Sequence, residues 1–208
     1  MTAPTRIAVL ASGRGSNLQA ILDAIAAGRL RAEVVGVFSD RPAAAALQRV
    51  SANLRWAHAP KEFQDRAAYE QALGDALAAV APDWIVCAGY MRILGAAFVQ
   101  RFNGRLVNIH PSLLPLHKGL DTHARALDAG DAEHGASVHL VVPELDAGAV
   151  LAQVRVRIFC AETIRTPFFA PPAICSSPAP HSPMSWTFTS SWLPDQPRIF
   201  PYYFMPGD

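Results

Sequence analysis

The sequence predicts a doubly wound α/β fold built on a mostly parallel sheet. Up to residue 158, short apolar segments alternate with longer segments whose apolar residues recur at helical spacing. The segment 84–88 is apolar throughout, as expected for a strand that helices cover on both faces. The total length of 208 residues suits one domain, with room for an appendage.

The strands follow from the short apolar segments. Five of them predict the strands of the main sheet, at 6–12, 33–39, 55–59, 84–88 and 106–110. Two later segments, 137–142 and 149–156, are separated by a loop that contains glycine and predict a hairpin.

The helices occupy the intervals between these strands. The first has apolar residues at Leu18, Ile21, Leu22 and Ile25, the spacing of one helix face. The second begins with a proline, which favours the first position of a helix, and the third is rich in alanine. The predicted helices are 17–27, 42–50, 65–80, 95–101 and 122–129.

Composition excludes several classes of protein. The formal net charge is +1 and there is no basic stripe, which argues against a nucleic-acid partner. There is no apolar run of membrane-spanning length and no signal-peptide core at the N-terminus, so we expect a cytoplasmic protein with no membrane partner. Cys87, Cys160 and Cys175 are too widely spaced for a metal clip or a disulfide framework.

The composition changes abruptly after residue 158. Residues 159–208 hold ten of the 17 prolines, no lysine and many aromatic residues. Prolines at this density prevent any long helix. We therefore divide the chain into a domain at 1–158 and an atypical Pro/Ser/Phe-rich tail at 159–208.

The first candidate site lies at the end of the fifth strand. Asn108 and His110 are two residues apart, so their side chains point to the same side of a strand. Pro111 ends that strand, and ligands of open α/β sheets bind at such ends. An amide there can donate to an oxyanion while an imidazole moves a proton. The alternative is a buried Asn and His that merely satisfy backbone groups near a turn.

A glycine-containing loop follows the first strand. Gly13 and Gly15 let the backbone approach an anion, and the helix that follows offers free N–H groups. Ser16 or Asn17 is expected to cap this helix or to bond a phosphate oxygen. There is no third glycine and no Gly-Lys-Ser/Thr, so a phosphate monoester fits better than a dinucleotide. The alternative is an ordinary strand-to-helix turn.

A carboxylate completes the possible catalytic set. Asp146 lies in the loop after the strand that carries Ser137 and His139. A carboxylate beside an imidazole favours the charged ring, and it fixes the tautomer and orientation of that ring. On its own, Asp-Ala-Gly is a common turn, so Asp146 is a candidate only together with Asn108 and His110. His58 and His117 have no partner pattern and are expected at the surface.

The chain resembles the glycinamide ribonucleotide formyltransferase family of purine biosynthesis. Five segments carry the resemblance, in the family's order and at near-family spacing, across residues 6 to about 158. They are ASGRGSN at 11–17, GYMRIL at 89–94, NIHPSLLP at 108–115, GLDTH at 119–123, and HGASVH at 134–139 continuing to ELDAG at 144–148.

The resemblance implies a fold, a reaction and a set of roles. The fold would be the formyltransferase fold, with a Rossmann-like N-terminal half. The amine of a phosphoribosyl glycinamide would attack the formyl group of 10-formyltetrahydrofolate. Asn108 would contact the oxyanion, His110 would be the general acid, and Asp146 would hold and charge His110.

The resemblance also implies binding residues. The phosphate site would comprise Gly13, Gly15, Ser16, Asn17, Leu18 and Gln19. The folate pocket would comprise Arg66, Met91, Arg92, Ile93, Leu94 and Asn108, with Ser137 and His139 behind the catalytic residues. The folate is a cosubstrate, no metal is implied, and the expected state is a monomer or weak homodimer.

The resemblance ends near Phe159. The family continues with a polar loop, a long helix and a glutamate that helps to hold the glycinamide amine. We hypothesise that a reading-frame shift near codon 159 replaced these elements. Two alternatives to an active formyltransferase therefore remain. One is a catalytically impaired or non-catalytic protein of the same fold, and the other is a 10-formyltetrahydrofolate hydrolase.

Overall fold

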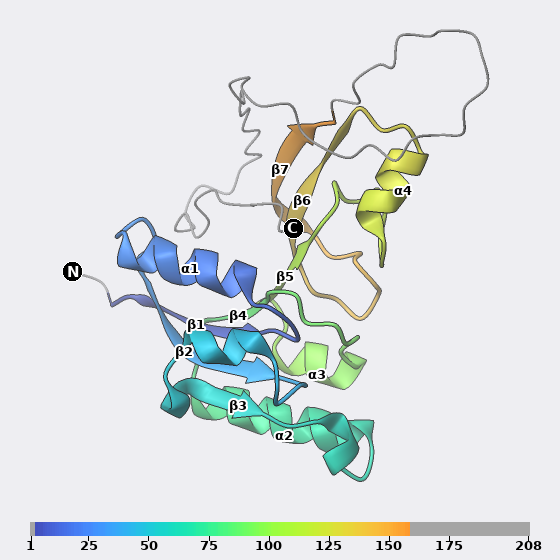
Figure 1. Ribbon diagram of the computed structural model, residues 1–208. Helices are drawn as coiled ribbons and strands as arrows, with labels where there is room; N and C mark the ends of the chain where they lie inside the picture. Colours follow the sequence, from blue (N-terminus) through green and yellow to red (C-terminus); the bar gives the residue numbers. More distant parts are fainter. Residues whose placement is uncertain (1–2, 159–208) are drawn as a thin grey trace, which may run out of the picture.

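A computed structural model of the chain describes residues 3–158, and the tail predicted at 159–208 lies outside the described residues. The described part forms a seven-stranded sheet in the order β3-β2-β1-β4-β5-β6-β7 (Figure 1). All pairings among β1 to β5 are parallel, whereas β5–β6 and β6–β7 are antiparallel. The strands are β1 (Thr5–Leu10), β2 (Ala32–Ser39), β3 (Arg55–Ala57), β4 (Trp84–Cys87), β5 (Leu106–His110), β6 (Glu133–Leu140) and β7 (Val150–Arg157). The predicted mostly parallel, doubly wound sheet is confirmed.

Four of the five predicted helices are present as α-helices. They are α1 (Ser16–Ala26), α2 (Arg66–Ala79), α3 (Ala96–Arg101) and α4 (Thr122–Asp128). Short 3-10 segments occur at η1 (Ala45–Arg49), η2 (Ala52–Leu54) and η3 (Pro60–Glu62).

The helix predicted at 42–50 is wrong, because only the 3-10 segment η1 forms there. In an α-helix that began at Pro42, the Ala46 N–H would bond to the Pro42 carbonyl. Instead it donates to the Gly13 carbonyl at 3.0 Å. A contact with the loop after β1 therefore replaces the local helix bond.

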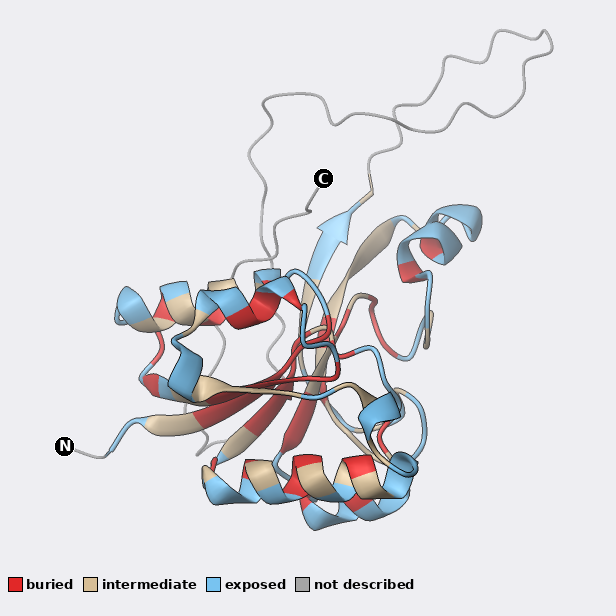
Figure 2. Cartoon of the chain, turned by 60° about the horizontal axis from the view of Figure 1, so that its bottom comes forward, coloured by how far each residue is buried: buried red, intermediate tan, exposed pale blue. Residues whose placement is uncertain are grey.

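The central strands are covered on both faces (Figure 2). Ile7 and Val9 of β1 pack with α1 and η1, whereas Ala8 and Leu10 pack with α2 and α3. This is the strict alternation of a strand, with an apolar layer on each side. It explains why β1 and β4 are apolar along most of their length.

The hairpin β6–β7 extends beyond this layered body, and α4 lies beside it (Figures 1 and 2). The hairpin was predicted from the sequence and is confirmed, but β6 begins four residues before the predicted position 137. Residues of β7 are exposed or only half-buried. Within residues 3–158, no helix is long and apolar enough to cross a membrane.

Candidate active site

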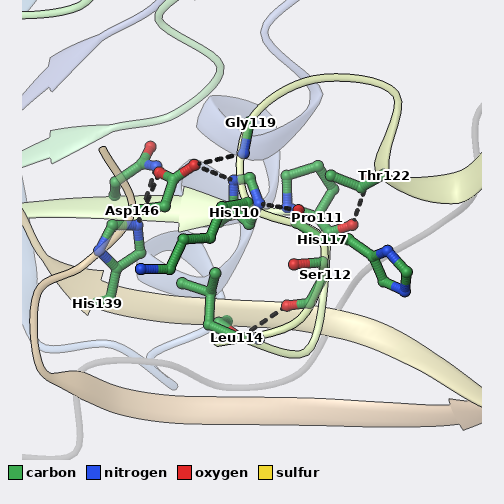
Figure 3. A network of polar contacts seen from close by, with 12 residues as sticks. His110, Pro111, Ser112, Leu114, His117, Gly119, Thr122, His139 and Asp146 are labelled. Atoms are coloured by element: carbon green, nitrogen blue, oxygen red, sulfur yellow. Dashed lines mark hydrogen bonds and ion pairs between the residues drawn. The ribbon is translucent and has the colours of Figure 1, made fainter. Parts of the chain in front are cut away.

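The site is centred on the carboxyl end of β5, where the antiparallel strand β6 lies beside it (Figure 3). The register pairs Asn108 with His139 and His110 with Ser137. The sheet therefore brings together four of the residues singled out in the sequence. His110, Ser137 and His139 are buried, and Asn108 is half-buried.

Asp146 lies between the two histidines. Its Oδ2 is 3.5 Å from His110 Nδ1, and its Oδ1 is 3.5 Å from His139 Nε2. The Gly119 N–H donates to Asp146 Oδ2 at 2.9 Å. Asp146 has a φ of 46°, in the left-handed region that most residues avoid. The turn after β6 thus adopts an uncommon conformation that directs this carboxylate toward the histidines.

The surroundings of Asp146 keep it ionised. Burial alone would raise the pKa of this carboxyl group, since it disfavours the charged form. The contact with His139, the Gly119 N–H and the charge of His110 outweigh burial and hold the pKa below its ordinary value. An anion is therefore fixed next to His110.

The contacts of His139 define how it holds Asn108. Its Nδ1 is 2.9 Å from the Leu140 carbonyl, which only accepts, so Nδ1 carries the proton. Its Nε2 lies 3.1 Å from Asn108 Nδ2 and 3.5 Å from Asp146 Oδ1, so the ring contacts both the amide and the carboxylate. An amide nitrogen has two hydrogens, so the second remains suited to an oxyanion.

The second nitrogen of His110 is engaged in this structure. His110 Nε2 donates to the backbone carbonyl of His117 at 3.0 Å. The prediction that His117 lies at the surface is wrong. Its Nε2 lies 2.6 Å from Asp131 Oδ2, and its side chain is largely buried. The contact with Asp131 thus fastens the loop that contains His117 next to the candidate acid.

Ser137 fastens the segment that follows β5. Its hydroxyl donates to the Ser112 carbonyl at 2.7 Å and accepts from the Leu114 N–H at 3.0 Å. Gln153 of β7 adds a bond to the same hydroxyl at 3.0 Å. The residue therefore orients the turn after His110.

The loop after β1 requires a glycine at position 15. Gly15 has a φ of 76°, and a Cβ there would lie 2.7 Å from Ala46, so only glycine fits. Arg49 donates to the Arg14 carbonyl and to Gln19 Oε1, at 2.9 and 2.7 Å. Neither Ser16 nor Asn17 caps α1, whose first turn has no side-chain cap.

Two residues of the predicted phosphate site can contribute only in limited ways. Leu18 is fully buried, which leaves its backbone N–H as the group it can offer. The Gln19 N–H bonds to the Gly15 carbonyl, and its side chain bonds to Arg49 and Asp23.

The segment 89–95 lies at the carboxyl end of β4 and contains Met91, Arg92, Ile93 and Leu94, which were predicted to line a folate pocket. We call it the folate loop. Met91 and Ile93 are exposed, whereas Leu94 is buried. Arg92 lies over the Tyr69 ring, with its guanidinium carbon 5.9 Å from the ring centroid.

The exposed side chain of Arg66 bonds to the folate loop. Its Nη2 donates to the Ile93 carbonyl and its Nε to Glu70 Oε1, both at 2.7 Å. Glu70 in turn accepts from the Gly95 N–H at 3.1 Å.

Several residues that hold this loop were not predicted as site residues. Tyr69 bonds Tyr90 through their hydroxyl groups at 2.8 Å, Ser12 bonds the Met91 N–H and Asp40, and Glu70 bonds the Gly95 N–H. Ser12 ends the first predicted strand and Asp40 follows the second, which was an available signal. The contacts of Tyr69, Glu70 and Tyr90 depend on the tertiary fold, so the sequence offered no comparable signal. No group of three or more His, Cys, Asp or Glu side chains within residues 3–158 is arranged to hold a metal ion.

Comparison with known proteins identifies the family of the chain. Residues 5–167 match the family described as formyl transferase. The phosphoribosylglycinamide formyltransferase of Escherichia coli K12 is 46% identical over 159 residues, which cover 76% of this chain and 75% of that protein. The trifunctional purine biosynthetic protein adenosine-3 of Drosophila melanogaster is 45% identical over 74% of this chain and 12% of its own length.

Solved structures of formyltransferases have a similar fold. The phosphoribosylglycinamide formyltransferase from Coxiella burnetii has a TM-score of 0.71 and 46% identity, covering 77% of this chain and 76% of that one. Glycinamide ribonucleotide transformylase 1 from Symbiobacterium toebii has a TM-score of 0.72 and 38% identity, with the same coverage of 77% and 76%. The chain therefore belongs to the formyl transferase family of enzymes.

Proposed function

We propose that this protein transfers the formyl group of 10-formyltetrahydrofolate to the amine of 5-phosphoribosylglycinamide, a step of purine biosynthesis. The observation that carries the proposal is the convergence of Asn108, His110 and Asp146 at the end of β5, in a chain whose relatives are named for this reaction. Both substrates are small molecules, and the folate is a cosubstrate.

Asn108 and His110 have complementary roles. The substrate amine attacks the formyl carbon, and the carbonyl oxygen becomes an oxyanion. The Asn108 N–H that does not bond His139 donates to that oxyanion, which stabilises the charge where it develops. His110 then gives a proton to the folate nitrogen as the carbon–nitrogen bond breaks. The proton lost by the attacking amine restores the imidazolium.

Asp146 acts through His110. A carboxylate that stays ionised favours the imidazolium form, which is the form a general acid needs. Its bond from Gly119 and its contact with His139 fix the carboxylate, so the His110 ring is held in one orientation. Ser137 and His139 support this arrangement without touching the reacting atoms.

Proton donation requires a change at the His117 loop. His110 Nε2 is the nitrogen that faces away from Asp146, and it is bonded to the His117 carbonyl. Bound folate must therefore replace this carbonyl as the partner of Nε2. Catalytic hydrogen bonds often form fully only with substrate present, so this geometry accords with the assigned role.

The two substrates have separate loops at the same edge of the sheet. Gly13, Gly15, Ser16 and Asn17, with the N–H of Leu18 and the neighbouring Gln19, are assigned to the ribonucleotide phosphate. The folate loop residues Met91, Arg92, Ile93 and Leu94, together with Arg66 and Asn108, are assigned to the folate.

Product analysis tests the proposal against a hydrolase. We expect tetrahydrofolate release that depends on the glycinamide ribonucleotide, with the formyl group recovered on its amine. Release of formate at the same rate without the amine would instead identify a 10-formyltetrahydrofolate hydrolase.

The change in composition after residue 158 supports one further possibility, an impaired protein with the same catalytic residues. We assign catalysis to residues 1–158 and ascribe the tail at 159–208 to a shifted reading frame. Sequencing the coding DNA tests this assignment. An alternate frame that encodes a polar loop and a helix is expected, and its absence would contradict the frameshift.

A further inference from the structure

We propose that Asp40 and Ser12 form a buried positioning pair that holds the folate loop and ties it to the loop for the ribonucleotide phosphate. The inference rests on the proposed function, because it concerns how the two substrate sites are arranged relative to each other. Neither residue touches a reacting atom, so both act through the loops that they hold.

The pair makes a short chain of hydrogen bonds. Ser12 Oγ donates a hydrogen bond to Asp40 Oδ1 at 2.6 Å. Ser12 Oγ also accepts a hydrogen bond from the Met91 N–H at 2.9 Å. Ser12 is 1% exposed and Asp40 is 6% exposed, so water competes little for these bonds. Hydrogen bonds that involve a carboxylate are among the stronger ones in proteins.

Asp40 determines which way the Ser12 hydroxyl points. A hydroxyl has one hydrogen and two lone pairs, and it rotates to suit its surroundings. With the hydrogen committed to the carboxylate, a lone pair faces the Met91 N–H. Without the carboxylate the hydroxyl is free to rotate, and the Met91 N–H loses a fixed acceptor.

Chain connectivity makes this pair a link between two sites. Ser12 immediately precedes Gly13, the first residue assigned to the phosphate loop, and Met91 lies within the folate loop. β1 lies between β2 and β4 in the sheet. Asp40 lies beyond the carboxyl end of β2, Ser12 beyond that of β1 and Met91 beyond that of β4. Ligands of doubly wound sheets bind at such a point, where successive connections diverge.

The chain of bonds is not needed to complete the sheet. The backbone of Ser12 already bonds to the Gly89 carbonyl at 3.0 Å, and that of Ala11 bonds to the Phe38 carbonyl at 3.0 Å. The far end of the folate loop is held by Arg66 and Glu70, and Arg66 is exposed. The Asp40–Ser12 pair is therefore a buried side-chain anchor at the near end, beside the exposed Met91.

The test measures binding of a non-reactive formyl-folate analogue to the full-length chain by calorimetry. Ser12→Ala and Asp40→Ala are each expected to weaken binding about 3- to 10-fold, the effect of losing one net hydrogen bond. The double variant should lose no more than Ser12→Ala alone, because Asp40 acts through Ser12. Asp40→Asn should restore most of the affinity, because an amide oxygen also accepts from the hydroxyl.

Ser39→Ala is the matched control. Ser39 is as buried as Ser12 and lies at the end of β2, but its hydroxyl bonds only within its own turn, to the Arg41 carbonyl and N–H. It should bind the analogue as the wild type does. If Asp40→Ala does not fold, Ser12→Ala carries the test, and hydrogen exchange at the Met91 amide should be faster in it than in Ser39→Ala.

The outcomes separate this inference from the proposed function. Wild-type affinity and Met91 exchange in folded Ser12→Ala would overturn the positioning pair while formyl transfer stood. Additive losses from Ser12→Ala and Asp40→Ala would also overturn it, since the two residues would then act separately. Failure of the wild-type chain to bind the analogue would instead contradict the proposed function.

Discussion

The five parallel strands and the β6–β7 hairpin belong to one sheet but are built differently. Strands β1, β4 and β5 have apolar layers on both faces, and most of their residues are buried. Figure 2 shows that the hairpin is half-buried along β6 and largely exposed along β7. Val156 of β7 is 43% exposed. The polar residues Ser137, His139 and Asp146 nevertheless belong to this less buried part.

The difference assigns two tasks to two regions. The layered part supplies the stability and a rigid strand end that carries Asn108 and His110. The hairpin brings the groups that orient these two side chains, and it contributes little apolar burial. Substitutions in the two regions should therefore separate stability from catalysis.

The largest expected effect comes from Asp146→Ala, at the turn of the hairpin. It removes the anion that favours the charged form of His110, and it frees both histidines. We expect kcat to fall by about 10²- to 10⁴-fold, the usual contribution of a general acid. Steady-state kinetics measures this. A loss below tenfold in a folded variant would mean that Asp146 does not control His110.

The next effect concerns stability and compares Leu73→Ala with Val156→Ala. Leu73 of α2 is fully buried under the sheet, so truncation should lower the free energy of unfolding by about 2–5 kcal/mol. Val156→Ala, on the exposed β7, should change it by less than about 0.5 kcal/mol. Urea denaturation of both variants measures these changes. Equal losses in the free energy of unfolding would show that the hairpin contributes to the core as much as α2 does.

The smallest expected effect is a pH dependence of the free energy of unfolding that arises from His134 of β6, next to His123 of α4. Burial, with help from His123 and His117, lowers the pKa of His134 below its ordinary value of 6.5. The unfolded chain then binds the proton more readily, so the stability is full above pH 6.5 and is lost as pH falls through the folded pKa. The urea midpoint of unfolding of the wild type should therefore fall as the pH is lowered below 6.5.

His134→Gln should remove this part of the pH dependence. His58→Gln is the matched control, because His58 is an exposed histidine that contacts Glu62 beyond β3, at the opposite edge of the sheet from β7. An unchanged slope in His134→Gln would assign the effect to other groups.

Local patterns were enough to predict most of the sheet and the Asn108–His110 pair. Strand alternation and the i, i+2 rule depend only on neighbours in the sequence. The helix predicted at 42–50 failed because the Ala46 N–H bonds to Gly13, which lies 33 positions earlier. The contact of Gly119 with Asp146 and the buried pair of Ser12 with Asp40 likewise join distant segments. Pairings of this kind depend on the tertiary fold and cannot be predicted from spacing.

The most direct test of the account is the rate of tetrahydrofolate release by the full-length chain, with and without glycinamide ribonucleotide, in the wild type and in His110→Ala. We predict release that requires the amine and that falls by about 10²- to 10⁴-fold in the variant. His58→Ala, a histidine away from the site, should leave the rate unchanged. Release that is independent of the amine, or that survives in folded His110→Ala, would contradict the account.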